Sequence, residues 1–150
     1  MPGRHRRILV GYDGSPGGRR ALERAIEEAR GSRGRLMVLS VASMPLSLDA
    51  PRNFGTLDDI SPNEGADLSA PPDVVAHLVE ARDRLAEAGL QAELTWAAGE
   101  PGQVIVETAR RMRADVIVIG EHHHGFLAGL FGSDVDAEVK REAGCDVILA

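Results

Sequence analysis

The residues with the clearest chemical potential lie between an apolar run and the last predicted helix. The run Asp115–Ile119 stops at Gly120. The polar stretch Glu121–Gly125, with three histidines, follows, and Gly132–Ser133–Asp134 precedes the helix. In α/β proteins, loop amides and the positive end of a helix dipole at such a place commonly hold phosphate oxygens. The segment therefore predicts a nucleotide site, although histidines and an aspartate are unusual in such a loop.

The charge of the chain argues against a general nucleic-acid-binding protein. The 150 residues carry a formal net charge of −6, so a polyanionic partner would need a local basic patch. The short basic start, Arg4–Arg7, is interpreted as a solvated lead-in to the first strand rather than as a binding arm. We expect no nucleic-acid partner.

The length and the cysteine content are typical of one cytoplasmic domain. A chain of 150 residues, 43% of them hydrophobic, can bury a core without disulfides or metals as a single domain over residues 1–150. Its one cysteine, Cys145, is expected to be a buried, inert thiol, which fits a reducing compartment. The amino terminus lacks the apolar core of a signal peptide, and no apolar run approaches the ~20 residues needed to span a bilayer. We expect a soluble, cytoplasmic protein without a membrane partner.

Apolar runs and helical patterns alternate along the chain. Strands are predicted at Ile8–Val10, Leu36–Leu39, Gln91–Trp96, Asp115–Ile119 and Val147–Leu149. Helices are predicted from Pro16 to Gly31 or Gly34, from Pro71 to Gly89, from Gly99 through Met112, and from Ser133 to Ala143. This order predicts an α/β fold: a five-stranded, mainly parallel, doubly wound sheet with helices on both faces.

Four segments carry more specific expectations. Ser15 is predicted to cap the first helix, with Pro16 in its first position. Strict alternation in Gln91–Trp96 predicts a half-exposed strand at a sheet edge. The stretch from Ser43 to Ala70 is long and aperiodic, which predicts a mobile, lid-like or partly disordered loop. The last strand, Val147–Leu149, is apolar and expected at an edge, where a second copy could pair with it to form a dimer.

Four segments together resemble the universal stress protein family over nearly the full length. They are Ile8–Ser15, Gly99–Pro101, Ala114–Gly120 and Ala143–Leu149, in the expected order and spacing. The resemblance implies an adenine nucleotide alpha hydrolase-like fold and a homodimer through the last strand. It also implies a stress-response or regulatory role without catalytic residues, and at most slow ATP hydrolysis. The family includes ATP binders and non-binders.

The family's ATP binders carry the motif Gly-x2-Gly-x9-Gly-[Ser/Thr] after the fourth strand, and this chain aligns with it in two ways. Without gaps from Gly120, the later motif positions fall on His123, Ser133 and Asp134. With a loop one residue shorter, Gly132 and Ser133 retain the Gly-Ser step. Asp134 at the phosphate end would repel the ligand, whereas Ser133 would offer a hydroxyl and an amide. Both alignments stay open.

The resemblance also suggests which residues form the site. Asp13 would lie near the ribose or a phosphate-bound metal, and its alternative role is a turn or capping carboxylate beside Ser15. Val41 would contact adenine, with core packing as its alternative role. The loop would contribute Gly120, His123, Gly125, Gly132, Ser133 and Asp134. The ligand would be ATP or another adenine nucleotide, with or without magnesium, or there would be none.

The three histidines are interpreted as part of a polar loop rather than as a metal site, because adjacent loop residues rarely all point inward. Partly protonated near neutral pH, they would favour an anion. Phe126, Leu127, Leu130 and Phe131 are expected to pack onto the sheet or an interface. The alternative function is a non-nucleotide-binding interaction module of the same fold, with an unidentified protein partner and a degenerate phosphate site.

Overall fold

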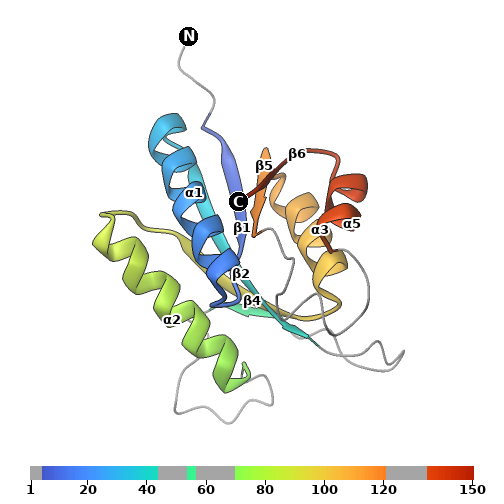
Figure 1. Cartoon of the computed structure of the whole chain (residues 1–150), viewed down its shortest axis with the longest axis horizontal. Helices are drawn as coiled ribbons and strands as arrows, with labels where there is room; N and C mark the ends of the chain where they lie inside the picture. Colours follow the sequence, from blue (N-terminus) through green and yellow to red (C-terminus); the bar gives the residue numbers. More distant parts are fainter. Residues whose placement is uncertain (1–4, 44–53, 57–69, 121–134) are drawn as a thin grey trace.

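A parallel sheet runs through the middle of the molecule (Figure 1). The computed structural model describes residues 5–43, 54–56, 70–120 and 135–150. Within these ranges the sheet has the order β3-β4-β2-β1-β5-β6. The strands are β1 (Arg7–Gly11), β2 (Arg35–Ser43), β3 (Phe54–Thr56), β4 (Glu93–Gly99), β5 (Val116–Ile119) and β6 (Asp146–Leu149). The five predicted strands are present and mutually parallel, which confirms the predicted fold class.

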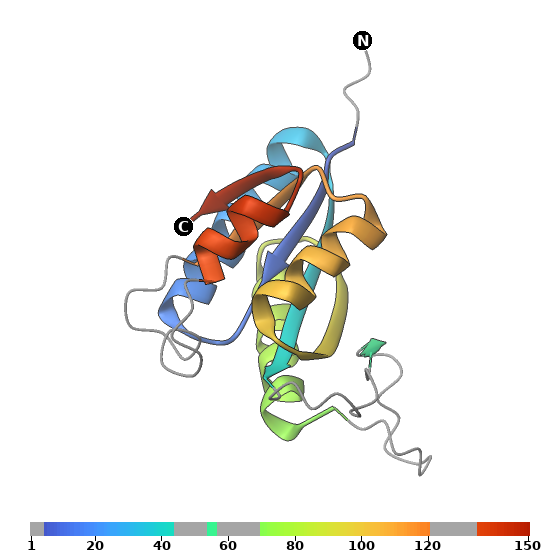
Figure 2. The ribbon, with the colours of Figure 1, turned by 90° about the vertical axis from the view of Figure 1, so that its right-hand side faces the viewer.

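Helices cover both faces of the sheet (Figures 1 and 2). On one face, α1 (Pro16–Ser32) and α2 (Pro72–Glu87) pack against the strands around Ile8 and Val10. On the other face, α3 (Pro101–Met112) and α5 (Val135–Glu142) pack around Leu9 and Ile117. Strands buried on both sides need a continuous apolar run, which explains the sequences of β1 and β5. No helix within the described ranges is long and apolar enough to cross a membrane.

The predicted edge position of the Gln91–Trp96 segment is wrong. The observed strand, β4, lies between β2 and a short antiparallel strand, β3, which sequence patterning did not reveal. Its alternation has another cause: Leu94, Trp96 and Ala98 pack with the α1 and α2 core, whereas Glu93 is exposed on the other face. The expectation of a mobile or disordered 43–70 loop falls largely outside the described residues.

The ends of α1 are set by different local chemistry. Ser15 caps its start as predicted, because the Ser15 hydroxyl accepts a hydrogen bond from the Gly18 amide at 3.0 Å. At the other end, Arg33 takes the left-handed conformation (φ 51°) that glycine usually supplies. Gly31 lies inside the helix, so the expectation that it ends α1 is wrong. The last helix was predicted from Ser133 to Ala143; α5 spans Val135–Glu142, and residues 133 and 134 lie outside the described ranges.

The end of β5 touches the beginning of α1 through backbone atoms. A Cβ built on Gly120 would lie 2.4 Å from the Gly17 carbonyl carbon and 2.5 Å from its oxygen. Real Cβ atoms do not approach backbone so closely, so this contact requires glycine at position 120. It places the start of α1 directly beside the carboxyl end of β5.

We expect Gly120→Ala to lower the free energy of unfolding by about 1–3 kcal/mol, because the added methyl group must push backbone apart. Gly31→Ala is the matched control: a Cβ there meets nothing within 4 Å, and alanine in a helix is favoured by about 0.5–1 kcal/mol. Neither glycine has a positive φ, so sterics alone distinguish them. Urea denaturation measures both values; an equal effect of the two substitutions would refute the contact.

Candidate functional site

The strand order reverses direction at β1, which makes the carboxyl ends of β1 and β5 a topological switch point. From β1 the chain proceeds to β2 and β4 on one side, and later to β5 and β6 on the other. The helix that follows β1 and the helix that follows the neighbouring strand β5 lie on opposite faces of the sheet. In open α/β sheets, ligands bind in the crevice at such a switch point.

Asp13 stands at this crevice with one carboxylate oxygen engaged and one unpartnered. Its Oδ1 accepts hydrogen bonds from the Ser15 amide at 3.0 Å and from the Ser15 hydroxyl at 2.5 Å. Its Oδ2 is buried and has no hydrogen-bond partner in the described structure. The turn and capping role considered for Asp13 is thus present, and it leaves a second acceptor unused.

Two glycines in the first turn of α1 let the helix begin against Asp13. Gly17 makes the backbone contact with Gly120, and a Cβ on Gly18 would lie 2.5 Å from the Asp13 Oδ1. Sequence analysis assigned neither glycine to the site. The sequence did contain a signal for these two glycines. Glycine is a poor helix former, so two glycines near the start of a helix indicate a structural requirement such as the close approach of another segment.

The pairing register brings Val41 and Gly120 to the same edge as Asp13. Gly11 pairs with Leu39 on β2, and the Tyr12 amide continues the ladder with a 2.9 Å hydrogen bond to the Leu39 carbonyl. Asp13 is therefore level with Val41, which is half-buried against the α3 core. Gly120, buried, directly follows β5 on the other side of β1.

The remaining predicted site residues, His123, Gly125, Gly132, Ser133 and Asp134, lie outside the described residues, and so does the whole histidine cluster. The choice between the two loop alignments is therefore open. Among the described residues, no group of three or more His, Cys, Asp or Glu side chains is arranged to hold a metal ion.

Tyr12, next to Asp13, is buried with an unpartnered hydroxyl. It is 2% exposed, and its hydroxyl makes no hydrogen bond of ordinary geometry in the described structure. Burial, and after it the nearby Glu80 carboxylate, raises the pKa of Tyr12 to about 12. In return the Tyr12 hydroxyl, together with Arg19 and Arg84, holds the pKa of Glu80 below its usual range.

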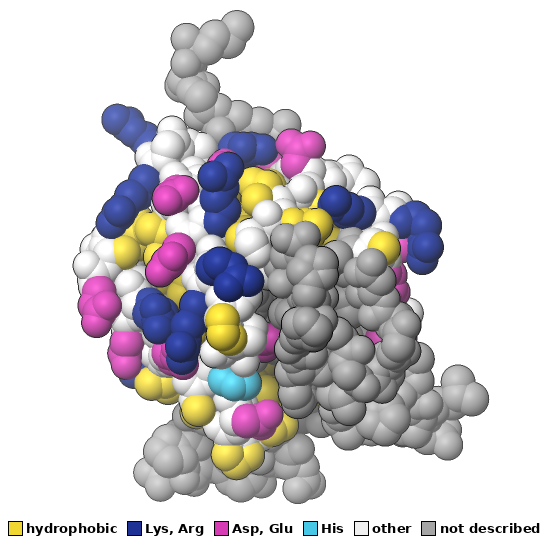
Figure 3. Space-filling model, in the orientation of Figure 1, with side chains coloured by type: hydrophobic (Ala, Val, Ile, Leu, Met, Phe, Trp, Pro, Cys, Tyr) yellow, Lys and Arg dark blue, Asp and Glu magenta, His cyan; other side chains and the backbone are white. Residues whose placement is uncertain are grey.

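Glu80 links α1 to α2 on the outside of the molecule. It pairs with Arg19 of α1 at 2.9 Å and with Arg84 of its own helix at 3.2 Å. The face over α1 and α2 shows basic and acidic side chains interspersed (Figure 3), and Arg24 and Glu28 form another such pair. The left-handed Gly14 (φ 73°) of the β1–α1 turn lies against the His77 ring of α2.

Cys145 is half-buried rather than fully buried as expected. Burial, followed by the charges of Asp146 and Asp115, raises the pKa of its thiol. A raised pKa lowers the thiolate fraction at neutral pH, and the thiolate is the reactive form. The prediction of an unreactive thiol is therefore consistent with its surroundings.

We expect the single tyrosine to titrate near pH 12 in the folded protein and near pH 10 when unfolded, because burial raises the pKa of Tyr12 from 10.0 to about 12. Stability from this group is complete below pH 10 and is lost as pH rises toward 12. Tyrosinate absorbance measures both midpoints. Tyr12→Phe should remove this alkaline loss and change stability at pH 7 by less than about 1 kcal/mol, because the hydroxyl interacts with Glu80 without a hydrogen bond of ordinary geometry. Destabilisation at pH 7 by more than about 1 kcal/mol would mean that the hydroxyl is partnered.

Comparison with known proteins places this geometry in a family. The model of the universal stress protein family matches residues 4–150. The universal stress protein Rv1636 of Mycobacterium tuberculosis is 30% identical over 146 residues, which cover 97% of this chain and 95% of that protein. The universal stress protein YxiE of Bacillus subtilis is 27% identical, with 95% of this chain and 97% of that protein covered.

A solved structure agrees with this placement. The crystal structure of a universal stress protein in complex with cAMP is 30% identical and superposes with a TM-score of 0.68. The match covers 97% of each chain. The parallel sheet, the crevice at β1 and β5, and the full-length similarity lead to one conclusion: this chain belongs to the universal stress protein family.

Proposed function

We propose that this chain binds an adenine nucleotide at the carboxyl ends of β1, β2 and β5, and that it acts as a dimeric regulatory module of the cytoplasmic stress response. The observation that carries the proposal is the Asp13 carboxylate, which is fixed by Ser15 through Oδ1 while its buried Oδ2 has no partner. A buried acceptor without a hydrogen bond is costly. A ligand with hydroxyl or amino donors would satisfy it.

The chemistry around Asp13 suits an adenine nucleoside. Ribose hydroxyls, and the exocyclic amine of adenine, are donors that a carboxylate accepts. Val41 offers an apolar contact at the same level of the neighbouring strand. The cAMP bound to the 30% identical universal stress protein supports a ligand of this class.

The phosphates and any magnesium ion would depend on the 121–134 loop, where Ser133 would favour ATP and Asp134 would oppose it. The alternative function rests on this same sequence. If His123 and Asp134 occupy the phosphate positions, the chain is an interaction module of the same fold whose site is degenerate. A nucleotide titration distinguishes the nucleotide-binding function from the interaction module.

We expect ATP, ADP, AMP or cAMP, tested with and without magnesium, to raise the melting temperature, because a ligand of the folded state stabilises it by mass action. Asp13→Asn should weaken binding about tenfold by calorimetry, because the Oδ2 acceptor becomes a donor while the amide oxygen still accepts from Ser15.

Asp83→Asn is the matched control, because it makes the same charge change on the exposed side of α2, where Asp83 has only a weak pair with Arg82. The Asp83→Asn variant should bind the nucleotide with the same affinity as the wild type. If no nucleotide raises the melting temperature at a concentration that stabilises a known binder, nucleotide binding is refuted and the interaction module is favoured.

We further propose that two copies pair through β6. This strand lies at the edge of the sheet and contributes half-exposed Val147, Ile148 and Leu149. The Ala150 amide donates to the Ile119 carbonyl at 2.9 Å. Because bonding directions alternate along a strand, the Leu149 amide points away from β5, toward the free edge. It is available to a second chain.

We expect light scattering to give a mass of twice 16.0 kDa for the wild type. Leu149→Pro should yield a folded monomer, because the outward amide is the only backbone donor that it removes and proline is tolerated at sheet edges. Leu149→Ala, which loses the side chain but keeps the amide, should remain a dimer. A monomeric wild type at micromolar concentration would count against pairing through β6.

A further inference from the structure

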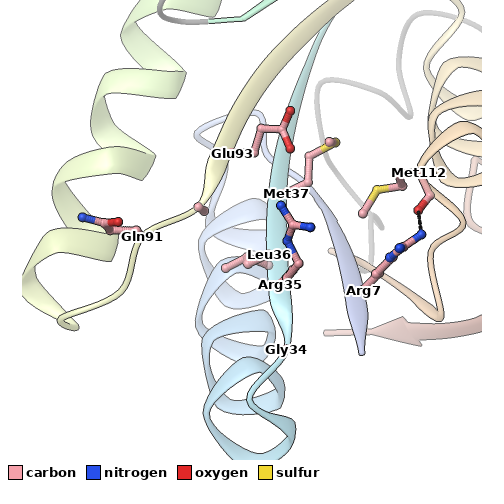
Figure 4. Close-up of a pocket in the computed structure, with 9 residues that line it drawn as sticks. Arg7, Gly34, Arg35, Leu36, Met37, Gln91, Glu93 and Met112 are labelled. Atoms are coloured by element: carbon pink, nitrogen blue, oxygen red, sulfur yellow. Dashed lines mark hydrogen bonds between the residues drawn. The ribbon is translucent and has the colours of Figure 1, made fainter. Parts of the chain in front are cut away.

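A hollow opens at the amino ends of the strands, at the far end of the sheet from Asp13 (Figure 4). Its volume is about 460 Å³, within the range of roughly 300–1,000 Å³ that is typical of small-molecule sites. The side chains that give it chemical character are Arg7, Arg35, Met37, Glu93 and Met112.

The hollow exists because the helix layer on this face stops short. Met37 pairs with Glu93 across β2 and β4, and Arg35 lies two residues before Met37 on the same face. These three side chains form one wall. Arg7 of β1 and Met112, the last residue of α3, form the other wall (Figure 4).

The two arginines stand directly beside each other in the pairing register, since Arg7 is the partner of Arg35. Both side chains are exposed, and like charges at paired positions repel each other, so an anion bound beside them would be favoured. Arg7 is partly engaged, because its Nη1 donates to the Met112 carbonyl at 3.1 Å. The Arg35 guanidinium has no hydrogen bond or ion pair with any residue that the structure describes. Arg35 is therefore the arginine that is more available to bind an added anion.

Next to the arginines, above them in Figure 4, the lining is formed by two methionine side chains. The side chains of Met37 and Met112 approach each other across the hollow (Figure 4), and both are half-buried. Thioethers make favourable contacts with aromatic rings. Two arginines and one glutamate give the lining one net positive charge, which suits a monoanion better than a phosphate dianion.

We propose that this hollow is a second ligand site, independent of the nucleotide crevice, that binds a small aromatic carboxylate. The ring lies between Met37 and Met112. The carboxylate accepts a forked pair of hydrogen bonds from the Arg35 guanidinium, the geometry that arginine and carboxylate favour. The positive charge of Arg7 adds electrostatic attraction for the carboxylate. The negative charge of Glu93 disfavours ligands that carry more than one negative charge.

Methyl-labelled methionine provides a direct test by NMR on the full chain, which contains four methionines. Benzoate and indole-3-acetate are the probes. We expect saturable shifts of the Met37 and Met112 methyl signals, assigned with Met37→Leu and Met112→Leu. Acetate supplies the charge without the ring and benzyl alcohol the ring without the charge, so neither should produce the saturable shift.

Three charge variants complete the experiment. Arg35→Gln should weaken benzoate binding about tenfold, and Glu93→Gln should strengthen it by about two- to fivefold by removing a repulsive charge. Arg33→Gln, the matched control, changes the same charge at the same edge outside the hollow and should leave binding unchanged. The proposal is overturned if neither probe shifts the Met37 and Met112 signals at tens of millimolar. It is also overturned if Arg35→Gln and Arg33→Gln bind benzoate equally.

Discussion

The backbone contact between Gly17 and Gly120 is the constraint on which the carboxyl edge of the sheet depends. It fixes how closely the first turn of α1 approaches the end of β5. That approach sets the position of Ser15, whose amide and hydroxyl hold the Asp13 carboxylate. A side chain at Gly120 would separate helix and strand, and the carboxylate would lose its place at the switch point between β1 and β5.

The elements buried on both faces could be predicted from the sequence. Ile8–Val10 and, within the predicted strand Asp115–Ile119, Val116–Ile119 are continuous apolar runs because helices cover them on both sides. Ser15 could be predicted as a helix cap because side-chain and backbone chemistry are local there. The places of Asp13, Val41 and Gly120 at one edge follow from parallel pairing, which the alternation of strands and helices implies.

Features that depend on partners distant in the sequence could not be predicted. The alternation in Gln91–Trp96 looked like an edge strand, but it arises because Leu94 and Trp96 pack into the α1 and α2 core while Glu93 is exposed on the other face. The unpartnered Asp13 Oδ2 and Tyr12 hydroxyl are relations among several elements, and no local pattern encodes them. Arg7 was interpreted as part of a solvated lead-in, because nothing local indicates that it starts a strand beside Arg35.

The poor helix-forming start of α1 has a consequence for how the molecule moves. Its Pro16–Gly17–Gly18 turn has little intrinsic helical preference, so the Ser15 cap and the contact with Gly120 must hold it closed. Such a turn lies at the low end of local stability and opens more readily than the rest of the helix. Any molecule that binds Asp13 only when the turn is closed must reduce that opening, by linkage. Arg19, which directly follows this turn, pairs with Glu80 and so joins the start of α1 to α2.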